Sequence, residues 1–160
     1  ELVERLVLLD PAIHLDPAIA LHVAEGSRAD RSYGSFEEAV DQRYVESALS
    51  SAPRELVEDE LREHLVPSED GRWRYRYSQA SVIAAYGEMA SPPPPFTQVS
   101  APTLLVLGDR SYLPYDHLLD AHRTAAGDLL DVVVVEGGHT LLWDALEQTA
   151  EAVAEFFADH

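Results

Sequence analysis

Residues 130–140, with the sequence LDVVVVEGGHT, decide the fold of this chain. An uninterrupted apolar run such as residues 132–135 is typical of a strand that is covered on both faces in a parallel sheet. Gly137 and Gly138 allow the backbone to turn sharply after the strand. A helical pattern then continues to Phe157. We therefore expect His139 on a loop between a buried strand and a terminal amphipathic helix.

Two more apolar runs have the character of buried strands, at residues 6–9 and 103–107. Residues 116–126 lie between the second and third runs and have apolar side chains at helical spacing, with Gly127 as a stop signal. A strand, a helix, another strand and a terminal helix predict an α/β fold with a parallel sheet between helical layers.

The segment over residues 12–96 has a different pattern. Asp16 before Pro17 predicts a helix start, and that helix ends at Gly26. Further helices are expected from a Ser35-x-x-Glu38 capping box through Leu49, and over residues 53–65 and 78–89. Residues 72–77 alternate arginine with aromatic residues and fit either a short strand or a loop. The four prolines at 92–95 predict an extended spacer, so the insert is mainly helical.

Composition limits the classes of function. The 160 residues include 29 acidic and 11 basic side chains, giving a net charge of -18, which disfavours binding to nucleic acid. No apolar run approaches the roughly 20 residues that cross a bilayer, so no membrane partner is expected. The chain has no cysteine, which excludes disulfides and thiolate chemistry and permits a cytoplasmic location. It begins at Glu1 instead of Met, as a fragment or a processed chain would.

In order, these elements resemble the C-terminal half of an α/β-hydrolase. The matching segments are RLVLLDP at residues 5–11, APTLLVLG at 101–108 and GGH at 137–139. The resemblance makes residues 1–11 and 97–160 the C-terminal part of the hydrolase core. It makes residues 12–96 a helical cap inserted between two strands. The implied fold is a three-layer α/β-hydrolase sheet with a cap.

The resemblance also implies chemistry. His139 corresponds to the general base of a Ser-His-acid triad, and no G-x-S-x-G nucleophile motif occurs in these residues. The nucleophile, the oxyanion donors and the first five strands of the family would precede Glu1. An open sheet edge is a liability in a folded protein. We therefore expect the chain to need the upstream half of the same fold as its partner.

The acid of the triad departs from the family pattern. The resemblance places it near Ser111, and a serine cannot stabilise an imidazolium as a carboxylate can. Asp10, at the end of the first strand, is the preferred candidate, because some members of the fold carry the acid there, similar to certain haloalkane dehalogenases. Asp109 is the second candidate. Asp116 is expected to cap the following helix.

Aromatic side chains are candidates for contact with substrate. Trp73 and Tyr75 lie in the expected cap and Tyr112 follows the second long strand, although a structural role in the small core of the cap is equally open. The other histidines show no ligand spacing, so neither a metal nor an organic cofactor is expected. His22 and His122 are predicted to be half-buried. The terminal helix is predicted to pack through Leu142, Trp143, Leu146, Val153, Phe156 and Phe157.

The sequence thus favours a hydrolase of the serine esterase or lipase type that acts on a small apolar ester or acyl substrate. A catalytically decayed, ligand-binding member of the same fold is a second hypothesis, which Ser111 at the usual acid position supports. A dehalogenase or cofactor-free peroxidase of this fold is a third, and the upstream nucleophile would separate it from the first.

Overall fold

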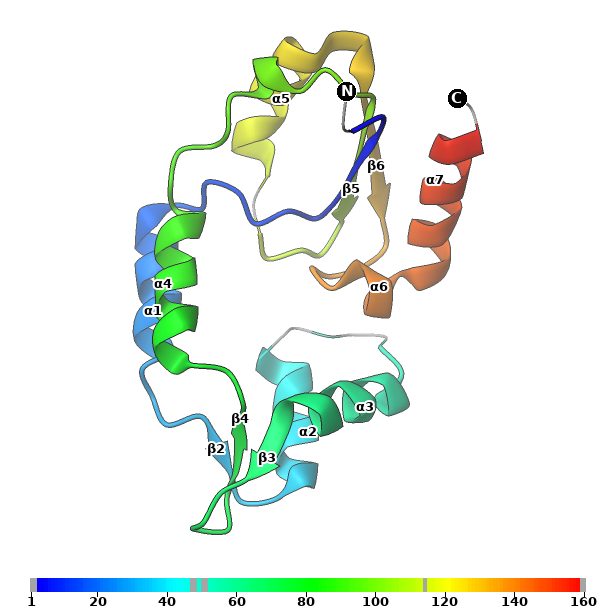
Figure 1. Ribbon diagram of the computed structural model, residues 1–160. Coiled ribbons are helices and arrows are strands. Elements are labelled where there is room, and N and C mark those ends of the chain that lie inside the picture. Colours follow the sequence, from blue (N-terminus) through cyan, green and yellow to red (C-terminus); the bar gives the residue numbers. More distant parts are fainter. Residues whose placement is uncertain (1–2, 47–48, 50–51, 114, 159–160) are drawn as a thin grey trace. The chain divides into compact units, whose positions relative to one another are not determined.

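The computed structural model describes residues 3–46, 49, 52–113 and 115–158. These residues form two compact units, one from residues 1–13 and 92–160 and the other from residues 14–91 (Figure 1). Each unit has its own sheet. The assignment of residues 12–96 as a cap stays a prediction.

The first unit is built on a parallel sheet. Its strands are β1 (Leu6–Leu9), β5 (Thr103–Gly108) and β6 (Leu130–Val135), in the order β1-β5-β6. Leu6 pairs with Thr103, and Gly108 pairs with Val135, so β5 and β6 end side by side. Helix α5 (Asp116–Ala126) and the short η2 (Gly127–Leu129) connect β5 to β6. The three predicted strands, their parallel arrangement and the connecting helix are confirmed.

Both faces of the central strand, β5, are covered. Leu104 and Val106 of β5 face a cluster that includes Phe156 of the C-terminal helix. Leu105, which lies between them, faces the opposite cluster with Leu118 of α5. Figure 1 shows α5 and α7 on opposite sides of the strands. An uninterrupted apolar sequence is therefore required here, because successive side chains of β5 are buried against different layers.

The C-terminal helical stretch is two helices, α6 (Leu141–Asp144) and α7 (Leu146–Ala158). Ala145 interrupts them with a non-helical backbone, φ -143° and ψ 42°. The break rotates the buried face of α7, which consists of Thr149, Ala152 and Phe156. The predicted stripe was therefore wrong at three positions, because the side chains of Leu142, Leu146 and Phe157 are each about half exposed.

The second unit combines helices with a small antiparallel sheet. Its helices are α1 (Pro17–Gly26), α2 (Phe36–Glu46), α3 (Arg54–His64) and α4 (Gln79–Met89). Its strands are β2 (Ser32–Tyr33), β3 (Leu65–Pro67) and β4 (Trp73–Tyr75), in the order β2-β4-β3. Of residues 72–77, which fitted either a strand or a loop, Trp73–Tyr75 form the central strand of this sheet and the others lie outside it. The other two strands were not predicted.

The helix starts follow the capping signals in the sequence. The Asp16 side chain accepts from the Ala18 N–H at 2.7 Å, with Pro17 as the first helical residue. The Ser35 hydroxyl accepts from the Glu38 N–H at 3.1 Å, as in a capping box, but Glu38 reaches back to the Gly34 N–H. The predicted end of α2 at Leu49 lies partly outside the described residues, and the described helix stops at Glu46.

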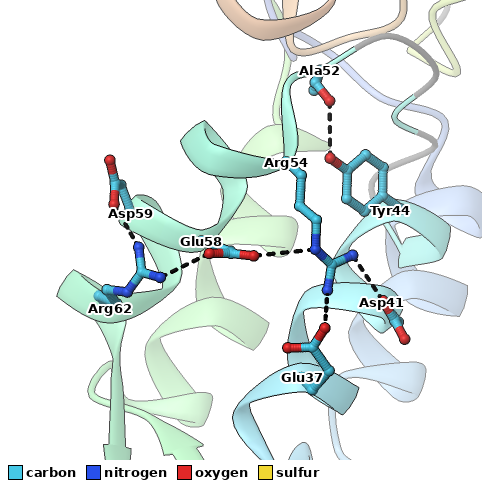
Figure 2. Close-up of polar contacts among 8 residues, drawn as sticks. All are labelled: Glu37, Asp41, Tyr44, Ala52, Arg54, Glu58, Asp59 and Arg62. Atoms are coloured by element: carbon cyan, nitrogen blue, oxygen red, sulfur yellow. Dashed lines mark hydrogen bonds and ion pairs between the residues drawn. The ribbon is translucent and has the colours of Figure 1, made fainter.

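Helices α2 and α3 are joined by an ionic network that centres on Arg54 (Figure 2). Its guanidinium contacts Glu37 and Asp41 of α2 and Glu58 of α3. Arg62 continues the network to Glu58 at 2.7 Å. Exposed ion pairs contribute little singly and are screened by salt. The network therefore bridges the two helices but adds little to the stability of the unit.

The arginines of residues 72–77 divide between two kinds of partner. Arg74 forms a pair of hydrogen bonds with the Asp70 carboxylate at 2.8 and 2.9 Å. This contact, with the Arg72 N–H, lowers the pKa of Asp70 to about 2. The Arg72 side chain instead donates to the hydroxyl and carbonyl of Ser32.

Candidate active site

Asp10 lies at the carboxyl end of β1, where the chain leaves the sheet. Its N–H donates to the Val106 carbonyl at 2.7 Å. Its φ is 43°, in the left-handed region that aspartate tolerates better than most residues. The side chain is only 2% exposed, and its Oδ1 accepts from the Gly108 N–H at 3.1 Å. A strained, buried carboxylate at the end of a parallel strand is characteristic of a functional position.

His139 lies against this carboxylate. Its Nδ1 is 2.8 Å from Asp10 Oδ2, and 129 residues separate the two in sequence. An ionised carboxylate can only accept hydrogen bonds. The neutral tautomer that suits this contact therefore carries its proton on Nδ1 and has a lone pair on Nε2. The Asp10 side chain is almost fully buried, whereas the His139 side chain is 31% exposed, so the ring has one protected and one accessible side.

Ser111 is the third member of the cluster. Its hydroxyl donates to Asp10 Oδ2 at 2.5 Å and accepts from the Leu113 N–H at 3.1 Å. Ser111, which stands after β5 where the triad acid was expected, thus contacts Asp10, the candidate acid that follows β1. Sequence analysis found the serine but missed this contact, because the pairing of β1 with β5 is needed to bring the two loops together.

Asp109 lies nearby but contacts a different group. Its Oδ1 accepts from the Gly137 N–H at 2.9 Å and is 3.6 Å from Arg110. The Asp109 side chain is 41% exposed, against 2% for Asp10. Of the two candidate acids, the structure brings Asp10 to the imidazole and Asp109 to the backbone of the loop before it.

Gly108 permits a close approach between the end of β5 and this loop, and Gly137 permits one between the loop and Ala145. A Cβ atom on Gly108 would lie 2.4 Å from the Gly138 carbonyl oxygen and 2.5 Å from that of Gly137. A Cβ atom on Gly137 would lie 2.9 Å from Cβ of Ala145. Neither position has room for a side chain, so the His139 loop lies directly on the end of β5.

The three candidate substrate contacts are distributed over both units. Tyr112 packs edge-on against the His139 ring, with centroids 5.4 Å apart, and is 56% exposed. Trp73 packs edge-on against Phe36, and Tyr75 stacks on Tyr77, all within residues 14–91. Burial raises the pKa of Tyr75, which lines a pocket of about 210 Å³ in the second unit. Trp73 and Tyr75 therefore contribute to the packing of the second unit.

His122 and His22 differ from the predicted half-burial in opposite directions. His122 is 1% exposed, its ring stacks on Phe96, and its Nδ1 is 3.0 Å from the Tyr115 hydroxyl. Burial lowers the pKa of His122 and raises that of Tyr115. His22 is exposed on α1. A helical pattern alone could not distinguish them, because the covering residue Phe96 comes from the segment after the proline spacer.

Two further properties concern the described residues as a whole. No three His, Asp or Glu side chains in residues 3–46, 49, 52–113 and 115–158 converge as a metal site requires. Within the same residues, no helix combines the length and the apolar character that a bilayer span needs.

Comparison with known proteins supports the fold. No family model matches the sequence. The chain is 30% identical over 142 residues to the lipase LipV of Mycobacterium tuberculosis, an alignment that covers 86% of this chain and 52% of the lipase. The chain thus spans about half the length of the curated relative it matches.

Solved structures agree with this relationship. An E-2-(acetamidomethylene)succinate hydrolase superposes with a TM-score of 0.80 at 20% identity, over 98% of this chain and 58% of that one. An esterase of M. tuberculosis superposes with a TM-score of 0.67 at 22% identity, over 98% and 55%. The chain therefore has the α/β-hydrolase fold and covers a little over half of the length of each of these relatives.

Proposed function

We propose that this chain supplies the general base and the acid of a serine hydrolase that cleaves a carboxylic ester or a related acyl bond. The observation that carries the proposal is the contact between His139 Nδ1 and the buried carboxylate of Asp10, at 2.8 Å. A buried carboxylate that fixes the tautomer of a half-exposed imidazole has the geometry of the base in a catalytic triad. The similarity to a lipase supports the choice of ester chemistry.

In the proposed reaction, His139 Nε2 removes the proton of a serine hydroxyl as the oxygen attacks the ester carbonyl. Asp10 stabilises the imidazolium that forms and does not itself take up the proton. The same proton then passes from Nε2 to the leaving alkoxide, which departs as an alcohol. Water, activated by His139 in the same way, releases the acid from the acyl-enzyme. This balance requires no metal and no organic cofactor.

The serine and the oxyanion donors would come from a preceding half of the same fold. That half would also cover the sheet edge at β1. Residues 12–96 would act as a cap, and Trp73, Tyr75 and Tyr112 remain the candidate contacts with a small apolar substrate. A cytoplasmic location belongs to this proposal. A chain without cysteine forms no disulfides and is compatible with a reducing compartment.

The contact of Ser111 with Asp10 weakens the hypothesis of a decayed, ligand-binding member. A serine at the position expected for the acid suggested a lost triad. Here its hydroxyl donates to the alternative acid, so a serine at this position is compatible with a working triad. An acid on β1 equally fits a dehalogenase or another member of the fold with different chemistry, and this is the second candidate.

The test compares His139→Ala with wild type in the complete protein, that is, with any preceding segment the gene encodes. The assays are hydrolysis of p-nitrophenyl butyrate and halide release from 1-bromobutane. His22→Ala is the matched control, because His22 is exposed on α1. We expect His139→Ala to reduce kcat/KM for the ester by about 10³-fold or more, with His22→Ala unchanged.

Each result has a distinct meaning. The dehalogenase alternative would be supported if wild type released halide but did not hydrolyse the ester, and if His139→Ala lost the halide release. Ester turnover by folded His139→Ala close to that of wild type would refute the assignment of the base. A folded wild-type protein without either activity would favour a binding role.

A further inference from the structure

The loop that carries His139 is held by side chains through its backbone N–H groups. The Glu136 N–H donates to Gln148 Oε1 of α7 at 3.0 Å. The Gly137 N–H donates to Asp109 Oδ1, and the Gly138 N–H donates to Asp144 Oδ2 of α6 at 3.0 Å. Three successive amides before the histidine thus have acceptors from three separate segments.

These hydrogen bonds restrict a part of the loop that would otherwise be flexible. Gly137 and Gly138 have no side chains that could anchor the loop. Glycine loses more conformational freedom on ordering than any other residue. A glycine pair next to a catalytic base would therefore leave the ring poorly placed unless other groups fixed its backbone. The side-chain acceptors supply part of that constraint, and the Arg110 N–H, which donates to the Gly137 carbonyl at 3.0 Å, supplies another part.

Asp144 is the most unusual of the three acceptors because it is buried. The residue is 8% exposed, and the hydrogen bond to the Gly138 N–H is buried as well. A buried carboxylate is costly unless hydrogen bonds compensate it. Gly138 directly precedes His139, so this hydrogen bond fixes the peptide that enters the histidine, whereas the His139 carbonyl on the other side accepts from the Leu141 N–H at 3.0 Å.

We propose that Asp144 is a positioning residue, which holds the imidazole of His139 against Asp10 through the Gly138 amide. Asp109 acts in the same way one residue earlier, through Gly137. The inference rests on the proposed function only for its effect on turnover, since the placement of the ring can be observed without any substrate.

The test uses Asp144→Ala and Asp144→Asn in the complete protein. Both variants remove the charge, but asparagine keeps an oxygen that can accept from the Gly138 N–H. Their difference therefore isolates the hydrogen bond from the charge. Asp128→Ala is the matched control, because Asp128 is an exposed aspartate in η2, away from the loop.

We expect Asp144→Ala to lower kcat for p-nitrophenyl butyrate by about 10- to 100-fold, as a displacement of a catalytic group of up to about 1 Å would. KM should change little. Asp144→Asn should recover most of the loss, and Asp128→Ala should equal wild type. Wild-type kcat in folded Asp144→Ala would overturn the proposal.

NMR separates this inference from the proposed function. In wild type, the Gly138 amide should exchange slowly with solvent, and the Nδ1 proton of His139 should give a resolved downfield signal. Asp144→Ala should lose both, even if the protein proves inactive toward every ester. If the alanine variant does not fold, the wild-type protein decides, because rapid exchange of the Gly138 amide there would overturn the proposal.

Discussion

Replacing Gly108 with alanine tests whether the end of β5 sets the position of the His139 loop. The added Cβ atom would lie 2.4 Å from the Gly138 carbonyl oxygen, whereas ordinary contact begins at 3.4 Å. The shortfall is about 1 Å. The two obstructing atoms, the carbonyl oxygens of Gly138 and Gly137, belong to backbone that cannot rotate aside. The loop must therefore move away from β5 by about that distance.

The displacement should affect both activity and stability. A misplacement of about 1 Å in a catalytic group can reduce turnover by about 100-fold, so we expect that loss in kcat with little change in KM. Overpacking should lower the free energy of unfolding by roughly 1–3 kcal/mol. The assays are hydrolysis of p-nitrophenyl butyrate and urea denaturation of the complete protein.

The matched control is Gly87→Ala in α4, where a Cβ atom would meet nothing within 4 Å. This change should leave kcat unaltered and stabilise the protein by about 0.4–1 kcal/mol, because alanine restricts the unfolded chain. A folded Gly108→Ala protein with wild-type kcat and stability would refute the argument that this contact positions the loop.

Three further predictions concern packing, the acid and pH. Phe156→Ala should cost about 3–5 kcal/mol of unfolding free energy, whereas Phe157→Ala, at a half-exposed ring, should cost less than about 1 kcal/mol; equal costs would show that the register of α7 is wrong. Ser111→Ala removes a hydrogen bond to a charged, buried acceptor and should cost about 1.5–3 kcal/mol by urea denaturation, and an unchanged midpoint would contradict the contact with Asp10. Burial lowers the pKa of His122 below its ordinary value of 6.5, so the unfolded chain takes up a proton first as pH falls. The free energy of unfolding should therefore be at its full value above pH 6.5 and decline below pH 6.5. His122→Phe should weaken this decline, and an identical pH profile in the variant would refute the role of His122.

The core of the first unit was predictable from the sequence because one physical requirement determines it. A strand buried on both faces needs an uninterrupted apolar run, and the runs at residues 6–9, 103–107 and 132–135 are too short for buried helices, although Val134 in the last run is 62% exposed. The helix starts at Asp16 and Ser35 were likewise predictable, since capping acts within three residues along the chain.

Features that depend on distant contacts were not predictable. Strands β2 and β3 are short, and their pairing with β4 is visible only once the loops close. The break at Ala145 lies against the His139 loop, where a Cβ atom on Gly137 would lie 2.9 Å from Cβ of Ala145, a contact between segments that the local sequence does not reveal. The predicted stripe on the terminal helix was wrong for this reason, because it assumed one uninterrupted period from Leu142 to Phe157.

The candidate site falls between these two cases. His139 and the two candidate acids could be named from sequence, because each follows a predicted strand. The geometry of these residues could not be predicted. The choice between Asp10 and Asp109 depends on the pairing of β1 with β5, which brings Asp10 to the imidazole and leaves Asp109 on the backbone of the loop. Asp144 carried no signal in the sequence, where it is one acidic residue among 29.

The most direct test of the account compares Asp10→Asn with Asp109→Asn in the complete protein, by kcat/KM for p-nitrophenyl butyrate. Asparagine tolerates the positive φ at residue 10, so the first change removes charge without new backbone strain. At residue 109, asparagine keeps an acceptor for the Gly137 N–H. The account predicts a loss of about 10³- to 10⁴-fold for Asp10→Asn and less than about 10-fold for Asp109→Asn. Near-normal activity of Asp10→Asn, or an equal loss in both variants, would contradict it.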